Sequence, residues 1–306
     1  MKIFDPKIYI TIFVIYIFLF ISFIIYKLIK YKTKKDNIEL SQRISSWFIM
    51  ITSFVIFIYL NDTLAIFFLA FLSYLSYKEY ISLIPTRIAD RRIIFYGYLF
   101  IIPQYYFAYV QWYEMFIITI PVYFFLFISF RQMLIGETKG FIENTSKIYW
   151  GSMLFIFAIS HCAYLFRLES NNVHGYLLVL YLVFLTEFND VLQYVCGKIF
   201  GKRKIVPKVS PNKTVEGLIG ATFFIIILAI VFRFLTPFSI VESIFAGLII
   251  SLGGFIGDVI ISMVKRDIGV KDAGNFISGH GGIIDRLDSL TYTAPLFFHF
   301  VYYLYF

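Results

Sequence analysis

The side chains best suited to chemistry lie near the C-terminus, in residues 262–288. This segment of 27 residues holds four cations, four carboxylates, five glycines and one of the four histidines of the chain. Asp285 and Asp288 are three residues apart, so a helix would place both carboxylates on one face. Paired carboxylates beside Lys and Arg suit a divalent metal ion that bridges to phosphate oxygens, and glycines let backbone N–H groups approach an anion. The segment therefore predicts phosphate chemistry assisted by a metal ion.

A basic juxtamembrane loop that binds lipid headgroups is the simpler interpretation of the same residues. It would account for Lys265, Arg266 and Lys271 through the preference of cytoplasmic loops for cations. It would not account for the run Gly-His-Gly-Gly at 279–282, with the Asp-Arg-x-Asp pattern at 285–288 close behind it.

A second polar segment, residues 201–217, combines a cation-rich loop with the start of a helix. Ser210 followed by Pro211 is typical of an N-cap with proline at the first helical position. The free N–H groups of such a helix start would suit a phosphate. The segment lacks the Gly-x4-Gly-Lys-Ser/Thr pattern of a P-loop. A solvated basic loop in front of an ordinary helix is the alternative.

Several carboxylates interrupt runs that are otherwise apolar. Glu187 and Asp190 lie in one run, and Asp258 lies in another, beside glycines that would allow close helix packing. Carboxylates within a membrane indicate function by default, although an ion pair between helices or a polar packing residue would also explain them. We interpret Glu79, at the boundary of a third run, as a snorkelling charge. The scattered residues His161, His174 and His299 are interpreted as interfacial or packing residues.

The elements that must position these residues are membrane helices. Hydrophobic residues make up 60% of the 306-residue chain, aromatic residues 21% and charged residues only 15%, which excludes a soluble globular protein. Cys162 and Cys196 lie inside separate apolar runs and are expected to be small buried side chains, without a disulfide. The net charge of +8 lies in the loops between runs, so it does not predict binding to nucleic acid.

The apolar runs predict an all-α, polytopic bundle of about ten transmembrane helices. The first run is followed by its positive cluster and shows no cleavage site, so we expect a retained helix with its N-terminus outside and no signal peptide. No Gly/Ser-rich linker divides the chain. The expected spans are 8–30, 44–60, 62–84, 93–110, 113–130, 148–166, 175–196, 214–235, 240–263 and 289–306.

The positions of the cations agree with this arrangement. When the sides of the membrane are assigned in turn from an outside N-terminus, 23 of the 27 Lys and Arg residues fall in cytoplasmic loops. Both termini should therefore face away from the cytoplasm, with 197–213 and 264–288 inside. The expected location is the inner membrane of the cell, with the active site at the cytoplasmic face.

Residues 262–288 match at every fixed position the signature of the phosphatidate cytidylyltransferase (CDP-diacylglycerol synthase) family. The pattern is Ser-x-apolar-Lys-Arg, then Lys-Asp-x-small, then His-Gly-Gly-apolar-x-Asp-Arg-apolar-Asp. Residues 210–217 resemble a second family motif, Ser-Pro-x-Lys-Thr/Ser-x-Glu-Gly. Around Asp190 the chain keeps Tyr194 and Gly197 but reads Val-Leu-Gln at 191–193, a departure that bears on the lipid acceptor. The resemblance covers 41–306, most strongly from 185 onward, which leaves 1–40 as an additional helix and basic linker.

The resemblance implies a transfer from CTP to phosphatidic acid that yields CDP-diacylglycerol and pyrophosphate. It implies Mg²⁺, and the family is also associated with K⁺ as a second ion. The expected partners are the two substrates and the lipid bilayer, with no nucleic acid; if the chain assembles, we expect a homodimer. The residues carried over are Lys265, Arg266, Lys271, Asp272, His280 and Arg286 for catalysis, Asp190, Ser210, Lys213, Thr214, Glu216, Gly281 and Gly282 for CTP and its phosphates, and Asp258, Asp285 and Asp288 for the metal.

Two alternatives remain open. One is a related CTP-dependent enzyme that acts on an isoprenoid lipid, either a CDP-archaeol-synthase-like cytidylyltransferase or a polyprenol-kinase-like enzyme. The other is a transporter that uses Asp190 and Asp258 in an ion path. A transporter should show internal repeats with matching broken helices, and the sequence shows none.

Overall fold

The computed structural model describes residues 61–170, 173–270 and 282–306, together with scattered positions before residue 61. The expected spans at 8–30 and 44–60 and the expected boundary near residue 40 lie outside the three continuous ranges. Within those ranges the chain is helical, apart from one isolated bridge and a small hairpin of β1 (Glu169–Ser170) and β2 (Val173–His174). The prediction of an all-helical fold is confirmed for this part of the chain.

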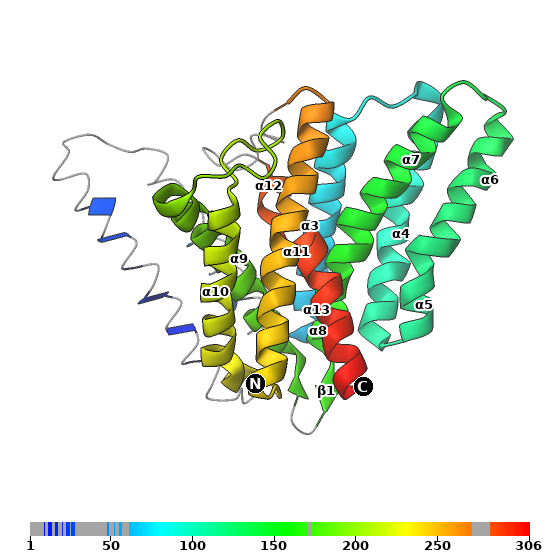
Figure 1. The fold of residues 1–306 in the computed structure, drawn as a ribbon. Coiled ribbons are helices and arrows are strands. Elements are labelled where there is room, and N and C mark those ends of the chain that lie inside the picture. The colour runs from blue at the N-terminus through cyan, green and yellow to red at the C-terminus, as the bar shows by residue number, and fades with distance from the viewer. Residues whose placement is uncertain are drawn as a thin grey trace.

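The helices cross the molecule as roughly antiparallel rods (Figure 1). In chain order they are α3 (Asp62–Leu83), the 3-10 turn η1 (Ile88–Asp90), α4 (Arg91–Val110), α5 (Tyr113–Ile118), the π-helical η2 (Thr119–Phe124), α6 (Phe125–Ile135), α7 (Phe141–Ser152), the π-helical η3 (Met153–Ala158), α8 (Ile159–Arg167), α9 (Gly175–Phe200), α10 (Val215–Val231), the 3-10 turn η4 (Phe232–Leu235), α11 (Ile240–Asp267), α12 (Ile284–Leu287) and α13 (Leu290–Tyr305). The π-helical stretches continue their neighbours, so α5–η2–α6 is one rod and α7–η3–α8 is another.

The structure corrects the number of membrane spans. Among the described residues, seven helices are long and apolar enough to cross a membrane, and they lie at 62–83, 88–110, 113–135, 141–167, 175–200, 215–235 and 240–267. The expected span at 289–306 is instead α13, which has 16 residues. A full span needs about 20 residues. The prediction of ten full spans is therefore wrong in number, because the last apolar run is a shorter helix that follows the one-turn α12.

The α7–η3–α8 rod and α9 form the centre of the bundle. Every residue from Ile159 to Phe166 on α8 is buried, and so is every residue from Leu177 to Leu182 on α9. A helix that is apolar on all sides belongs in the interior, surrounded by other helices. His161 lies in this core with its ring centroid 5.1 Å from that of Phe298, in agreement with a packing role. The outer helices α6 and α10 expose large apolar side chains that suit contact with lipid.

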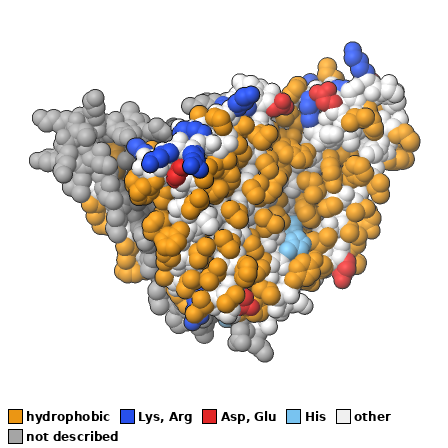
Figure 2. Space-filling view, in the orientation of Figure 1, with side chains coloured by type: hydrophobic (Ala, Val, Ile, Leu, Met, Phe, Trp, Pro, Cys, Tyr) orange, Lys and Arg blue, Asp and Glu red, His pale blue; other side chains and the backbone are white. Residues whose placement is uncertain are grey.

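Charge divides the two ends of the bundle. The connections α3–α4, α6–α7 and α9–α10 and the C-terminal end of α11 all lie at one end (Figure 1). Figure 2 shows Lys and Arg side chains along that end, above a broad apolar belt. The helix directions thus reproduce the alternation inferred from the distribution of cations, and the chain is a multi-pass membrane protein. By the positive-inside rule we expect the cationic end to face the cytoplasm.

Cysteine labelling tests this orientation. In a background where the buried Cys162 and Cys196 are replaced by Ala, Asn212→Cys should not react with an impermeant thiol reagent in intact cells, because residue 212 is exposed at the cationic end. The matched control is Ser170→Cys in the β1–β2 hairpin at the opposite end, which should react. Labelling of the Asn212→Cys variant from outside, without labelling of the Ser170→Cys variant, would mean that the orientation is reversed.

Candidate active site

Helices α9 and α10 approach each other backbone to backbone near the cationic end. A Cβ added at Gly217 of α10 would lie 2.9 Å from the Cα of Gly197 on α9, and one added at Gly220 would lie 3.0 Å from Cys196. Only glycine allows such a close approach without displacement of the neighbouring backbone. The contact fixes the 201–214 loop against the end of α9 that carries the polar residues 187–193.

Helix α10 begins later than the sequence motif suggested. Its first residue is Val215, and its N-cap is Thr214, whose hydroxyl accepts a hydrogen bond from the Gly217 N–H at 3.1 Å. The prediction that Ser210 caps the helix, with Pro211 in the first turn, is wrong. Residues 207–212 form turns instead, so Ser210 lies four positions before the cap.

The 201–214 loop is closed by its own hydrogen bonds. The Ile205 N–H donates to the Lys213 carbonyl at 3.2 Å. The carboxylate of Glu216 accepts from the N–H groups of Lys202 and Arg203, at 2.8 and 3.0 Å. Glu216 therefore anchors the loop to the start of α10, and in this conformation its carboxylate is directed to the loop backbone.

Lys213 extends from this loop into a cluster of acidic side chains. Its Nζ lies 2.5 Å from Oδ2 of Asp258 on α11 and 2.7 Å from Oε1 of Gln193 on α9. Asp190 and Asp288 are also within electrostatic range of its ammonium group. Burial opposes the charged form of Lys213, but these carboxylates outweigh it, so the pKa of the ammonium group is raised above its ordinary value.

Ser289 holds the cluster together at the junction between α12 and α13. Its hydroxyl donates to Oδ2 of Asp190 at 2.8 Å and lies 3.3 Å from the Gly254 carbonyl of α11, while its N–H donates to Oδ1 of Asp288 at 2.8 Å. A Cβ at Gly257 would lie 2.4 Å from the Asp288 carbonyl oxygen. The expectation that glycines allow close packing around Asp258 is thus confirmed, because the junction rests directly on the α11 backbone.

Asp285 has different partners from the other two predicted metal ligands. Its Oδ1 lies 2.5 Å from Nζ of Lys265, and its Oδ2 accepts from the Gly282 N–H at 3.1 Å. The Lys213 cluster and the Asp285–Lys265 pair are thus two neighbouring groups that meet at α12. Lys265 also lies within electrostatic range of Asp288, so the two groups adjoin.

Glu79 of α3 belongs to the site, and its interpretation as a snorkelling charge is wrong. Its Oε2 accepts hydrogen bonds from the N–H groups of Ile283 and Ile284, at 2.7 and 3.4 Å. A Cβ at Gly282 would overlap the Glu79 carboxylate, which explains the need for glycine at the end of the Gly-Gly pair. The only sequence signal was a carboxylate next to an apolar run; its partners lie more than 200 positions away.

The two arginines of the predicted site contribute in different ways. Arg266 donates from Nε to the Val209 carbonyl at 3.2 Å and so ties the C-terminal end of α11 to the 201–214 loop. Arg286 lies within electrostatic range of Glu187 and Asp190 on α9. The remaining predicted residues, Lys271, Asp272, His280 and Gly281, lie outside the described part of the chain.

The acidic cluster has features that suit a metal cation. Asp190, Asp258 and Asp288 lie close enough to repel one another, while Lys213 pairs with Asp258, Arg286 lies within electrostatic range of Asp190, and Lys265 lies within range of Asp288. Oδ1 of Asp190 is buried and has no hydrogen-bond partner among the described residues. No three His, Cys, Asp or Glu side chains in the described ranges are arranged as a ready metal site. The charge and the free oxygen fit a cation, and binding it would require these side chains to adjust.

Comparison with known proteins shows similarity to cytidylyltransferases. The family model described as "Cytidylyltransferase family" matches residues 41–304. "Uncharacterized protein YnbB" of Escherichia coli (strain K12) is 40% identical over 268 residues, which cover 87% of this chain and 88% of that protein. Phosphatidate cytidylyltransferase of Haemophilus influenzae is 40% identical over 136 residues, which cover 42% of this chain and 47% of that protein. The enzyme of the same name from Aquifex aeolicus is 32% identical over 162 residues, or 53% and 58% of the two lengths.

Removal of the Glu79 carboxylate should destabilise the protein. Hydrogen bonds to a charged group contribute about 1.5–3 kcal/mol, so Glu79→Ala should lower the free energy of unfolding by an amount on that order. Glu79→Gln, which keeps an acceptor oxygen, should have a smaller effect. Thermal unfolding in detergent measures both, with the exposed neighbour Lys78→Ala as control. Equal unfolding temperatures for the Glu79→Ala and Lys78→Ala variants would show that the contact contributes no net stability.

Proposed function

The chain belongs to the cytidylyltransferase family, and on that basis we propose that it transfers the cytidylyl group of CTP to a phosphate carried by a membrane lipid. The proposed acceptor is phosphatidic acid, and the products are then CDP-diacylglycerol and pyrophosphate. The observation that carries the proposal is the cluster of Asp190, Asp258 and Asp288 around Lys213. It joins the two sequence motifs at one point, at the cationic end of the bundle.

The charges of this cluster suit a nucleotide triphosphate better than they suit a simple packing contact. The three neighbouring carboxylates repel one another and so favour a metal cation between them, whereas the surrounding loop supplies Lys and Arg for phosphate oxygens. A divalent metal ion bridges such carboxylates to phosphates. We propose that Asp258 and Asp288 hold Mg²⁺, with Asp190 beside them, and that Asp285 joins them once it releases Lys265. K⁺ is the proposed second ion.

The proposed reaction needs no strong general base. A phosphomonoester is largely ionised at pH 7, because its second pKa is about 6. An oxygen of the lipid phosphate would attack the α-phosphorus of CTP, the bond from that phosphorus to the bridging oxygen would break, and pyrophosphate would leave with the electron pair. Catalysis would then rest on position and on neutralisation of charge. In the proposal Lys213, Lys265 and Arg286 neutralise phosphate oxygens, while Mg²⁺ supplies Lewis-acid polarisation when bound.

The most specific part of the proposal is the identity of the acceptor lipid, and Gln193 is the residue relevant to it. Gln193 lies in the 191–193 stretch that departs from the family pattern, and its Oε1 accepts a hydrogen bond from Lys213. Its Nε2 is buried and has no hydrogen-bond partner among the described residues. A free buried donor is available for an acceptor oxygen of a substrate. The isoprenoid alternative rests on the departure from the family pattern at 191–193, and an isoprenoid glycerol phosphate is the second candidate acceptor.

Substitution of the clustered carboxylates should abolish most of the activity. Asp258→Asn and Asp288→Asn each remove one negative charge with almost no change in volume. We expect turnover to fall by at least about 100-fold, the usual size of losses of charge stabilisation in a transition state. Asp267→Asn, at the exposed end of α11, is the matched control and should be nearly neutral. Near-normal turnover by a folded Asp258→Asn protein would refute the proposed role of the cluster.

Analysis of the leaving product tests the reaction itself. The purified protein with CTP, Mg²⁺ and phosphatidic acid should release pyrophosphate and form CDP-diacylglycerol, and EDTA should stop both. A lipid kinase would release CDP instead, and a transporter would release neither. Release of CDP without pyrophosphate would contradict the proposed chemistry. If only an isoprenoid glycerol phosphate supports release of pyrophosphate, the acceptor is wrong, and Gln193→Ala then tests whether this residue sets the choice.

A further inference from the structure

A pocket of about 580 Å³ opens at the cationic end, on the far side of the bundle from α10. It lies between the start of α4 and the end of α6. Its walls combine arginine with aliphatic side chains, and they are formed by Ile88, Ala89, Arg91, Arg92, Ile93, Arg131, Leu134 and Ile135. None of these residues belongs to the candidate active site. Ligand pockets in proteins commonly have volumes of roughly 300–1,000 Å³.

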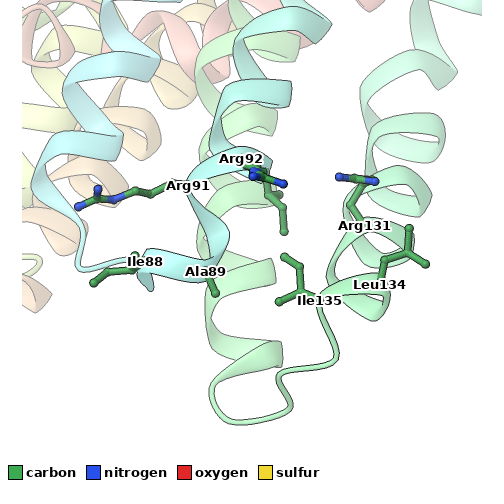
Figure 3. Close-up of a pocket in the computed structure, with 8 residues that line it drawn as sticks. Ile88, Ala89, Arg91, Arg92, Arg131, Leu134 and Ile135 are labelled. Atoms are coloured by element: carbon green, nitrogen blue, oxygen red, sulfur yellow. The ribbon is translucent and has the colours of Figure 1, made fainter.

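Two arginines face each other across this pocket. Figure 3 shows Arg92 on α4 and Arg131 on α6 with their guanidinium groups directed toward one another, while the head group of Arg91 points away. Nε of Arg131 is buried and has no hydrogen-bond partner among the described residues, and its guanidinium group stacks over the Tyr96 ring at 5.3 Å. Two like charges in this arrangement repel each other unless an anion lies between them.

The nearby carboxylates do not supply that anion. Asp90 is fully buried and is held by Arg87, with contacts of 2.7 and 3.0 Å, and by Gln132 at 3.3 Å. Glu143, on the neighbouring α7, pairs with Lys147 at 2.5 Å. Within the described ranges, no salt bridge joins a carboxylate to either pocket arginine.

The rim of the pocket is apolar and open. Ile88 has 77% of its surface exposed, Leu134 56% and Ile135 40%. In a membrane protein these side chains lie at the boundary where helices leave the hydrocarbon, which is where lipid headgroups meet their acyl chains. Basic pockets between helices on the cytoplasmic side are suited to anionic lipid headgroups.

We propose that this pocket binds the phosphate group of an anionic membrane phospholipid between Arg92 and Arg131. The two guanidinium groups hold the phosphate oxygens, since arginine binds phosphate with paired hydrogen bonds. The acyl chains extend along Ile88, Leu134 and Ile135. The site is separate from the CTP-dependent chemistry proposed above and does not depend on it.

The test compares the full chain with the double variant Arg92→Gln/Arg131→Gln in a neutral detergent. Binding of phosphatidylglycerol is measured by native mass spectrometry and by the shift in unfolding temperature when the lipid is added. Phosphatidylcholine and inorganic phosphate serve as the two other probes. Lys139→Gln, an exposed cation outside the pocket at the same end of the bundle, is the matched control. Each lost arginine should weaken binding roughly fivefold, hence on the order of 25-fold for the pair.

We expect phosphatidylglycerol to stabilise the full chain and the Lys139→Gln control, with little effect on the double variant. Without lipid, the double variant should unfold near the temperature of the full chain, because the loss of the Arg131 contact with Tyr96 opposes the removal of a repulsion. An equal lipid shift in all three proteins would overturn the proposal, as would a double variant that is less stable without lipid yet retains the full shift. Stabilisation by inorganic phosphate that depends on the arginines, with no added effect of the lipid, would overturn the assignment to a lipid.

Discussion

The structure depends on the contact of one partly buried ammonium group with a cluster of three carboxylates. Lys213 forms a salt bridge with Asp258 and lies within electrostatic range of Asp190 and Asp288, in a bundle of mostly apolar helices. Charges removed from water are costly unless they are paired and hydrogen bonded. The helices that carry these groups must therefore meet closely, and the glycine contacts of α9 with α10 and of α11 with the α12–α13 junction make this possible. Local backbone geometry and long-range electrostatics thus impose the same arrangement.

The cluster also lies where the end of the chain divides into two helices. At the junction between α12 and α13 the Ser289 hydroxyl donates to Asp190, and the Ser289 N–H donates to the Asp288 side chain, outside the regular helical pattern. The one-turn α12 before this junction has orphan N–H groups, as every helix start does. Glu79 accepts hydrogen bonds from two N–H groups at this start, so α3 supports α12.

Much of this arrangement could be predicted from the sequence, and the failures have physical causes. Hydropathy located the helices because lipid-facing and core residues are both apolar, but it could not separate a full span from the 16-residue α13. Ser210 and Thr214 are both acceptable caps by type, and only the closed loop decides between them. The pairing of Asp285 with Lys265 could not be predicted from the i, i+3 spacing, because Lys265 lies 20 positions away on α11. The contacts of Glu79 could not be predicted because its partners are distant in sequence.

The cations at one end of the bundle follow a single rule, yet they fall into two classes. The positive-inside rule explains the position of Lys213 and Lys265 as well as that of Arg92 and Arg131. Lys213 and Lys265 are each paired with a carboxylate of the chain, so an incoming phosphate must compete with that partner or arrive with a metal ion. The pocket arginines form no salt bridge within the described ranges, so a phosphate meets no such competition there. We therefore expect the pairing state of a cation, more than its side of the membrane, to decide how easily it binds a phosphate.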